Sequence, residues 1–422
     1  MGWQVNPSTV ALSETLSRSA GGAILFTVLA TVLNSALTCN LDWRKTLATF
    51  PNKLIETEHL GGLTMSATGQ AQSINEDKMN AFLGKVVGDF GASLSSALVY
   101  IGQKLGLYKA MSAAGPLTPA ELAQRTSTNE RYVREWLINQ AAGGYAEYDP
   151  ESGRYSLTPE QAVALTDDQS PFYVGGGFFV VKAMTGAVAR IEDHFRNGGG
   201  MLWGDHDPDL FIGTEKFFRP GYSAHLIASW IPSLTGIEDK LNAGGKVADI
   251  GCGHGASTII MAGAYPKSRF WGFDNHEASI QHARAAAAAA GVADRVTFEV
   301  ADAQSFPGEN YDLVCFFDCL HDMGDPVGAA RRAAASLAAD GSALIVEPMA
   351  GNTVQENFNP IGRTFAAAST LCCTSNSLAL GGPALGAVAS ENAIREKVLA
   401  GGFKQFRRAT ETPFNRVFEA RN

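Results

Sequence analysis

The amino-acid sequence predicts an α/β protein, in which a mainly α-helical N-terminal domain precedes a parallel sheet flanked by helices. Two observations support this fold class. From residue 246 onward, short apolar runs alternate with helix-like stretches, which is the pattern of successive β-α-β units. The first apolar run leads into the glycine-rich turn DIGCGHG at 249–255, and the helix after such a turn presents free N–H groups to a ligand.

Length and composition limit the class of protein further. The 422 residues allow two or three domains, and the net charge of −9 gives no general attraction to nucleic acid or to anionic membranes. None of the six cysteines has metal-ligand spacing, so we expect no zinc site and no disulfide framework. Reduced thiols in a cytoplasmic protein are the simplest interpretation.

Residues 1–64 differ from the rest of the chain. Residues 19–41 carry no charge and are long enough to be considered as a membrane span. Asn34 and the positive charges on both sides argue against a span, and a signal peptide would need a more basic start. A membrane anchor and an accessory helix remain alternatives, but we favour an N-terminal extension outside the fold, with Met65 as the natural start.

Residues 79–170 are predicted to form a winged helix. Apolar residues recur at helical spacing over 93–109, and two further helix starts follow at Thr118-Pro119 and at Thr128-Asn129. A short hairpin comes after Gly143-Gly144. A helix–turn–helix with a two-stranded wing suggests DNA binding, but residues 79–165 hold 7 Lys/Arg against 8 Asp/Glu. A DNA-reading domain needs a basic face, so we expect a structural, dimerising role and no nucleic-acid partner.

Residues 171–240 are rich in aromatic side chains and in glycine. We expect a helical connector, most of whose aromatic residues belong to a core stripe. Because pockets for small molecules favour domain junctions and aromatic walls, the same residues are also candidates for the wall of a substrate chamber.

Four acidic residues come at the ends of four consecutive predicted strands: Asp249, Asp274, Asp302 and Asp318. The carboxyl ends of parallel strands meet at one edge of a sheet, where ligands bind in open α/β folds. The glycine turn can be aligned with the NAD fingerprint, although the match is weak. An acid directly before the glycines would repel a pyrophosphate and suits a ligand with a cationic amine. The alternative for the later acids is that they cap helices.

With these motifs in order, residues 245–349 resemble a class I S-adenosylmethionine methyltransferase domain. The resemblance implies a Rossmann-like, seven-stranded sheet that ends in an antiparallel hairpin, for which the runs at 404–408 and 415–419 qualify. It also implies these cofactor contacts: Asp249, Gly251, Gly253 and Gly255 for the methionine part, Asp274 for the ribose, Asp302 and Ala303 for the adenine edge, and a cofactor-side role for Asp318.

Residues 79–422 as a whole resemble O-methyltransferases of the plant caffeate type and their bacterial relatives. In that family the N-terminal domain dimerises and helps to close the substrate pocket of the partner, so we expect a homodimer. The family's catalytic histidine corresponds to His321 within DCLHDMGD at 318–325, although Met323 stands where the family has Trp. Glu347, at the end of the fifth strand, matches the glutamate that orients this histidine and raises its basicity.

Two other interpretations of this stretch are open. His321 is a structural residue at a helix start in one of them. In the other, Asp318, Asp322 and Asp325 form a magnesium cluster, but Asp318 already has a role beside the cofactor, so we expect no metal.

The sequence therefore predicts an S-adenosylmethionine-dependent methyltransferase that acts on a small molecule, with O-methylation and His321 as general base. Transfer to nitrogen or carbon is the alternative within enzymes. A ligand-responsive DNA-binding regulator with a non-catalytic methyltransferase fold is the alternative of another class. The predicted segments are the extension 1–64, the winged helix 79–170, the connector and pocket wall 171–240, and the cofactor-binding domain 241–422.

Overall fold

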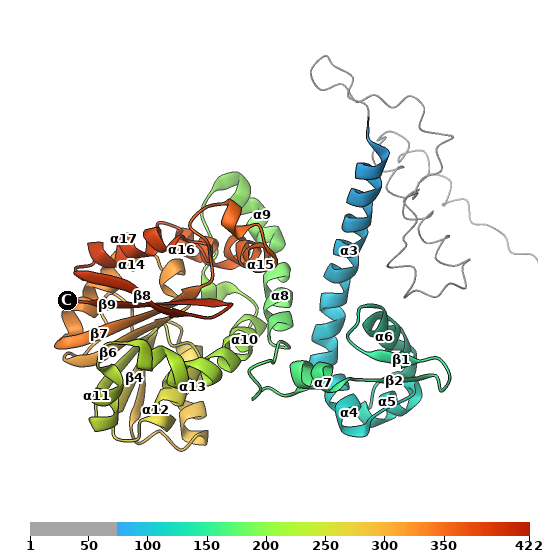
Figure 1. The fold of residues 1–422 in the computed structure, drawn as a ribbon, viewed down its shortest axis with the longest axis horizontal. Helices are drawn as coiled ribbons and strands as arrows, with labels where there is room; N and C mark the ends of the chain where they lie inside the picture. The colour runs from blue at the N-terminus through green and yellow to red at the C-terminus, as the bar shows by residue number, and fades with distance from the viewer. Residues whose placement is uncertain (1–73) are drawn as a thin grey trace, which may run out of the picture. The chain divides into compact units, whose positions relative to one another are not determined.

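The computed structural model describes residues 74–422, so the predicted extension and its apolar segment 19–41 lie outside the described residues. The chain divides into two compact units, one up to Ala92 and one from Ser93 onward. Helix α3 (Glu76–Lys104) belongs to both (Figure 1). By length and composition alone, α3 is long and apolar enough to cross a membrane. Its last turns, however, bury Val99 and Gly102 in the second unit.

The second unit begins with the predicted helix–turn–helix and wing. Its elements after α3 are α4 (Leu107–Ala114), α5 (Pro119–Thr126), α6 (Glu130–Ala142), β1 (Glu147–Asp149), β2 (Arg154–Ser156) and α7 (Pro159–Thr166). Thr118 closes a capping box with Glu121, and the Asn129 side chain caps α6, so both predicted helix starts are confirmed. The single helix expected over 93–109 is wrong, because Gly106 adopts φ +69° and separates α3 from α4.

The core of this domain is built around Trp136 of α6. Its ring meets Tyr108 edge to face, with 5.0 Å between the ring centroids. Its indole nitrogen donates a hydrogen bond of 2.8 Å to the carbonyl oxygen of Leu98 on α3. Gly102, one turn further along α3, leaves room for the same ring. These contacts hold the end of α3 in the winged-helix domain.

The connector is helical, as predicted. It comprises α8 (Gly177–Gly186), α9 (Val188–Asn197), the short turn η3 (Trp203–Asp205), α10 (Asp209–His225), and the turns η4 (Leu226–Trp230) and η5 (Ile231–Ser233). The carboxylate of Asp209 joins three elements: it accepts a hydrogen bond from Tyr100 of α3 (2.6 Å) and pairs with Lys104 of α3 and with Lys182 of α8. Burial alone would raise the pKa of Asp209, but these partners lower it to about 2.

The remaining chain forms the predicted seven-stranded sheet. Its strands are β3 (Lys246–Ile250), β4 (Arg269–Asp274), β5 (Val296–Val300), β6 (Tyr311–Phe317), β7 (Leu337–Pro348), β8 (Gln405–Glu411) and β9 (Asn415–Arg421). The strand order is β5-β4-β3-β6-β7-β9-β8 (Figure 1). The strands β3 to β7 are parallel, whereas β9 pairs antiparallel with β7 and β8 antiparallel with β9. The antiparallel hairpin at the end of the chain is therefore confirmed.

Helices cover both faces of this sheet (Figure 1). One face carries α11 (Ile237–Ala243), α12 (Ala256–Ala264) and α13 (Glu277–Ala289), and the other carries α14 (Pro326–Ser336) and α17 (Glu391–Ala400). The short elements η6 (Leu320–Asp322), η7 (Gln355–Asn357), α15 (Pro360–Ala368), η8 (Ser369–Cys373) and α16 (Thr374–Ala379) complete the chain. Val247 and Ala248, neighbours in β3, belong to the two opposite cores, so the central strand is buried on both sides.

The packing of Gly102 generates a stability prediction. A Cβ atom at this position would lie 2.6 Å from the ring of Trp136, whereas a Cβ at Gly88 of the same helix would meet open space. We expect Gly102→Ala to lower the free energy of unfolding by about 1–3 kcal/mol through overpacking. The matched variant Gly88→Ala should raise it by about 0.5–1 kcal/mol, because Ala is the better helix former. Thermal unfolding of both variants checks this, and equal shifts would contradict the packing.

Candidate functional site

The glycine turn after β3 is held tightly against the end of β4. The backbone N–H groups of Gly251 and Cys252 both donate to the carbonyl oxygen of Phe273, at 2.8 and 3.1 Å. Gly251, Gly253 and Gly255 all have positive φ, and a Cβ at Gly255 would lie 2.5 Å from the ring of Phe298. The turn therefore requires glycine for its backbone conformation and for close packing. After the turn the chain continues directly into α12, and the free N–H groups at the N-terminus of this helix face the turn.

Asp249 lies behind this turn and is fully buried. Its Oδ2 accepts hydrogen bonds of 2.6 Å from the hydroxyls of Ser257 and Thr258, while its Oδ1 has no partner in the described structure. Burial raises the pKa of Asp249 to about 6, although the two hydroxyls oppose the rise. Because a buried, unpaired carboxylate oxygen is costly, its presence here is what a site for a hydrogen-bond donor or a cation would show.

Asp274, the last residue of β4, braces the turn. One of its oxygens accepts from the backbone N–H of Gly253 and the other from that of His276, both at 2.9 Å. Burial raises its pKa, and these two donors oppose the rise. Asp302 is exposed and Ala303 is half-buried, just after the end of β5. The four predicted acids thus lie at or just beyond the carboxyl ends of neighbouring parallel strands, at one edge of the sheet.

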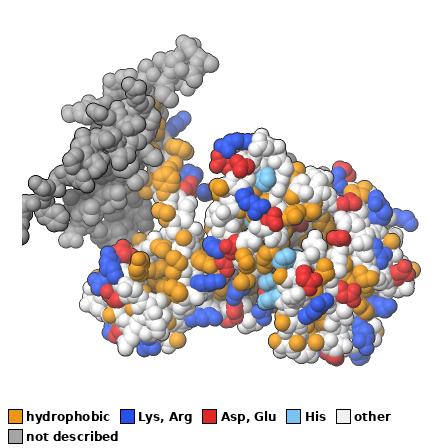
Figure 2. Space-filling view, turned by 180° about the vertical axis from the view of Figure 1, so that it is seen from behind, with side chains coloured by type: hydrophobic (Ala, Val, Ile, Leu, Met, Phe, Trp, Pro, Cys, Tyr) orange, Lys and Arg blue, Asp and Glu red, His pale blue; other side chains and the backbone are white. Residues whose placement is uncertain are grey.

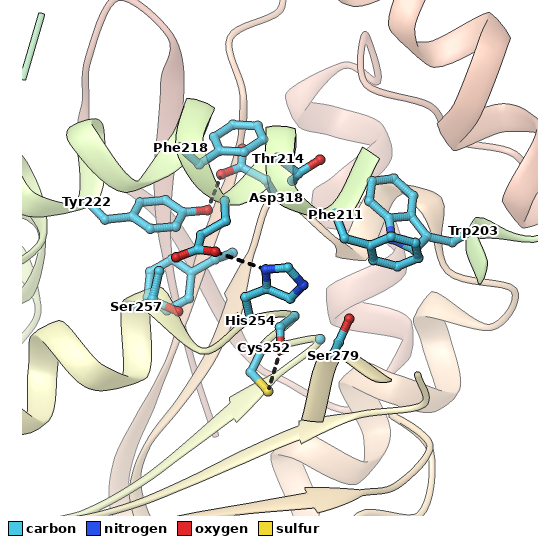
Figure 3. Close-up of a pocket in the computed structure, with 15 residues that line it drawn as sticks. Trp203, Phe211, Thr214, Phe218, Tyr222, Cys252, His254, Ser257, Ser279 and Asp318 are labelled. Atoms are coloured by element: carbon cyan, nitrogen blue, oxygen red, sulfur yellow. Dashed lines mark hydrogen bonds and ion pairs between the residues drawn. The ribbon is translucent and has the colours of Figure 1, made fainter. Parts of the chain in front are cut away.

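A pocket opens at this edge (Figure 3). It is lined by Trp203, Phe211, Thr214, Glu215, Phe218, Tyr222, Gly251, Cys252, Gly253, His254, Ala256, Ser257, Ser279, Phe317 and Asp318. From the predicted cofactor residues, it brings together Gly251, Gly253 and Asp318. Asp249, Asp274 and Asp302 do not belong to the lining. The aromatic wall comes from the connector, as expected, through η3 and α10.

Sequence reasoning missed Glu215. Its carboxylate lies 2.9 Å from Nδ1 of His254, inside the same pocket. Burial alone would raise the pKa of Glu215, but the neighbouring histidines lower it. Glu215 stands in the middle of α10, 39 residues before His254, and no local motif marks it. Only the packing of α10 against α12 brings it to the glycine turn.

Asp318 follows β6 directly and has φ +52°, a left-handed conformation that Asp adopts more readily than most residues. Its carboxylate accepts hydrogen bonds from the hydroxyl of Tyr222 (3.0 Å) and from the amide of Asn415 (2.9 Å). Burial, with a contribution from the charge of Glu347, raises the pKa of Asp318 to about 8. A cation that enters the pocket would therefore favour the charged form of Asp318.

His321 and Glu347 form a buried pair. Nδ1 of His321 lies 2.6 Å from Oε2 of Glu347, and the two side chains are 3% and 1% exposed. Burial alone would lower the pKa of His321, but the Glu347 carboxylate outweighs this and raises it well above its usual value. The contact fixes the tautomer of a neutral His321, because Nδ1 must carry the proton that it donates to Glu347. Nε2 is then the nitrogen that can accept a proton.

Cys373, which the sequence analysis did not single out, belongs to η8, and its Sγ lies within 4.8 Å of a ring nitrogen of His321. Asp325 caps α14, since its side chain accepts from the backbone N–H of Gly328 at 2.7 Å. Asp325 therefore has a structural role, which argues against a magnesium cluster of Asp318, Asp322 and Asp325. Among the described residues, Asp322 places a carboxylate oxygen within 4.8 Å of potential ligand atoms of His321 and Cys373.

Comparison with known families agrees with this architecture. The family described as "Methyltransferase domain" matches residues 241–391, and the family described as "Rv2258c-like winged HTH domain" matches residues 93–167. The chain thus carries an S-adenosylmethionine-dependent methyltransferase domain behind an N-terminal winged-helix domain, and the resemblance inferred from the sequence is confirmed.

Curated relatives include two methyltransferases. The chain is 34% identical over 163 residues to 27-O-demethylrifamycin SV methyltransferase of Amycolatopsis mediterranei, covering 37% of this chain and 56% of that protein. It is 32% identical over 150 residues to a tocopherol O-methyltransferase of rice, described as probable and chloroplastic, covering 33% of this chain and 40% of that protein. The chain therefore spans about half the length of these relatives.

Solved structures share the whole two-domain fold. Mitomycin 7-O-methyltransferase MmcR aligns with a TM-score of 0.61 at 18% identity, over 82% of this chain and 99% of that one. Human N-acetylserotonin methyltransferase, solved with S-adenosylmethionine, aligns with a TM-score of 0.57 at 17% identity, over 81% and 97%. At this identity the likeness establishes the fold.

The raised pKa of Asp318 predicts how cofactor affinity depends on pH. The group is mostly neutral at pH 7 and becomes charged as the pH rises through about 8. Because the positive cofactor favours the charged form, its affinity should increase with pH in this window, by at most about tenfold per pH unit for one released proton. Calorimetry with S-adenosylmethionine on the wild type and on Asp318→Asn measures this, and the comparison cancels the titration of the ligand itself. A pH dependence identical in both proteins would refute the assignment.

Proposed function

We propose that this protein transfers the methyl group of S-adenosylmethionine to a hydroxyl of a small molecule. The observation that carries the proposal is the buried pair of His321 and Glu347. His321 follows three residues after Asp318, and of these three residues Asp318 is the one that lines the pocket. A histidine whose tautomer is fixed by a buried carboxylate is suited to accept a proton from a hydroxyl.

The residues of the glycine turn fit the cofactor. Asp249 offers an unpaired, buried oxygen, and Asp318 and Glu215 add carboxylates to the pocket. Three acids at one edge suit a ligand with a sulfonium and an ammonium group, and they disfavour a pyrophosphate. When bound, the cofactor supplies an activated methyl group, so the chain's own task is mainly to align the acceptor and to take its proton.

The proton balance of the step is simple. The acceptor oxygen forms a bond to the methyl carbon while the carbon–sulfur bond breaks, and the electron pair of that bond stays on sulfur. The hydroxyl proton passes to Nε2 of His321, and Glu347 stabilises the imidazolium that results. His321 must be neutral to act, and its pKa is raised, so activity should increase with pH until this group is deprotonated.

The acceptor is proposed to be small and largely apolar. The pocket wall contributes Trp203, Phe211, Phe218 and Tyr222, which suit an aromatic or otherwise flat molecule. Relatives and neighbours of the same fold are named for O-methylation of small molecules, including an O-methyltransferase solved with S-adenosylhomocysteine and 1,4-dihydroxy-2-naphthoic acid (TM-score 0.54, 17% identity, 80% of this chain and 98% of that one).

The winged-helix domain does not favour the DNA-binding alternative. On α6, the second helix of the helix–turn–helix, Arg131 pairs with Glu135 and Arg134 with Glu130. Figure 2 shows Lys and Arg side chains interspersed with Asp and Glu over the face that it displays. Binding to a DNA backbone would need these arginines free to neutralise phosphates.

Removal of the base tests the proposed reaction. We expect His321→Ala to lower kcat by about 10²–10⁴-fold, the usual contribution of a general base, and to leave affinity for S-adenosylhomocysteine within a few-fold of wild type. The assay is transfer of a labelled methyl group to a panel of small phenols, alcohols, acids and amines. His194→Ala, on the connector helix α9, is the control and should keep full activity. Unchanged turnover in His321→Ala, or transfer only to amines, would refute O-methylation with this base.

Glu347→Gln tests the positioning role separately. Without the carboxylate the pKa of His321 falls, so the rising limb of the pH–rate profile should move to lower pH by at least about one unit. The plateau of kcat should fall as well, because the imidazolium loses its counter-charge. A merely structural role for Glu347 would lower the active fraction and leave the midpoint of the profile in place.

A further inference from the structure

Three side chains of types that can bind a metal ion lie close together at the rim of the pocket. They do not include His321 and Glu347, the pair that performs the proposed chemistry. Glu215 comes from α10, His254 from the glycine turn, and His282 from α13. Oε2 of Glu215 lies 2.9 Å from Nδ1 of His254 and 3.5 Å from Nε2 of His282. All three potential ligand atoms lie within 4.8 Å of one another.

These separations suit a transition metal. Zinc binds histidine nitrogen and carboxylate oxygen at about 2.0–2.2 Å, so two ligand atoms of a tetrahedral site are about 3.3 Å apart. The two distances from Oε2 of Glu215, 2.9 Å and 3.5 Å, lie on either side of that value. Two imidazoles and one carboxylate also form a frequent donor set of zinc sites that keep an open position.

The site is partly preformed. The side chains of His254 and Glu215 are only 9% and 21% exposed, and their contact already orients both groups. The ring of His282 stacks on that of His254, with centroids 3.9 Å apart, and must rotate to place a metal in its plane. Its side chain is 49% exposed, so it can make this movement.

We propose that Glu215, His254 and His282 bind one Zn²⁺ ion, and that this zinc and the cofactor weaken each other's binding. The first part stands on the three residues alone. The second part rests on the proposed function, because it assumes that S-adenosylmethionine or its product occupies the pocket that Glu215 and His254 line. A zinc ion would engage the Glu215 carboxylate and would place two positive charges beside the cationic methionine end of the ligand.

The sequence pattern did not indicate this site. The three residues are 39 and 28 positions apart, so they show no local ligand spacing. The expectation of no metal rests on the cysteine spacing and on the cofactor-side role of Asp318, and neither argument concerns these three residues. The site forms only because α10 and α13 both reach the glycine turn.

Zinc titration of the full chain tests the first part. In a buffer without chelating thiols, calorimetry should detect one zinc ion bound by the wild type. The variant His282→Asn should bind it at least about tenfold more weakly, since loss of a ligand costs no less than loss of a supporting group. His194→Asn is the matched control and should bind zinc as the wild type does. An unchanged affinity in His282→Asn would overturn the proposal.

A competing site is part of the same experiment. His321, Asp322 and Cys373 also place potential ligand atoms within 4.8 Å of one another. Zinc binding that is lost in Cys373→Ser and kept in His282→Asn would assign the ion to that buried cluster and overturn the proposed site. Binding kept in Cys373→Ser and lost in His282→Asn supports it.

Titration of S-adenosylhomocysteine with and without zinc tests the second part. Zinc should weaken the product's affinity by about fivefold or more in the wild type, and should have no such effect in His282→Asn. Equal affinities with and without zinc in the wild type would overturn the coupling. Failure of the zinc-free wild type to bind the product would instead count against the proposed function, while the zinc titration would stand unchanged.

Discussion

The hydrogen bonds between the glycine turn and the end of β4 hold the site in place. The carbonyl oxygen of Phe273 accepts hydrogen bonds from two backbone N–H groups of the turn, and the Asp274 carboxylate accepts a hydrogen bond from a third. These bonds fix a turn whose backbone is left-handed at three glycines. Because the turn is fixed, the N-terminus of α12, the buried Asp249 and the pocket rim have defined positions relative to one another. The parallel ladder from β5 to β7 then aligns the acids of neighbouring strands at the same edge.

Burial of charge is the second constraint on this edge. Asp249 and Asp318 are desolvated, and their pKa values are raised to about 6 and about 8. Such groups hold their protons into the neutral range, which costs less than burying bare charges. Through each of these two groups the folded state binds more protons than the unfolded chain, between about pH 4 and pH 6 for Asp249 and between about pH 4 and pH 8 for Asp318. Both groups therefore stabilise the fold less as the pH rises through these windows. A cationic ligand reverses this penalty by pairing with the charged forms.

His321 and Glu347 show the same principle with opposite charges. Burial would disfavour the charged form of either group alone, and the contact between the two groups offsets this cost. Asp318, close in sequence, links this pair to the pocket, since its own pKa responds to the charge of Glu347. The cofactor edge and the proposed base are thus parts of one electrostatic system, although they come from strands β3, β6 and β7.

Much of this arrangement was predictable from the sequence. The apolar runs of β3 to β7, the glycine turn and the two helix caps at Thr118 and Asn129 are local patterns, and local backbone and side-chain preferences determine them. The acids at the strand ends were predictable because parallel strands must share an edge. The pairing of His321 with Glu347 followed from a family resemblance, and the 2.6 Å contact agrees with it.

Other features required the tertiary structure. The break at Gly106 depends on where α4 can pack, and the roles of Asp249 and Asp274 behind the pocket depend on which oxygens the turn occupies. Glu215 and Cys373 reach the site from elements distant in sequence, so no local motif reveals them. The sequence by itself determined the order of strands and helices and the residue types at the sheet edge, because these follow from periodicity and turn chemistry. Only the packing of helices on the sheet decided which of those side chains face the ligand, because contacts between distant segments leave no periodic trace in the chain.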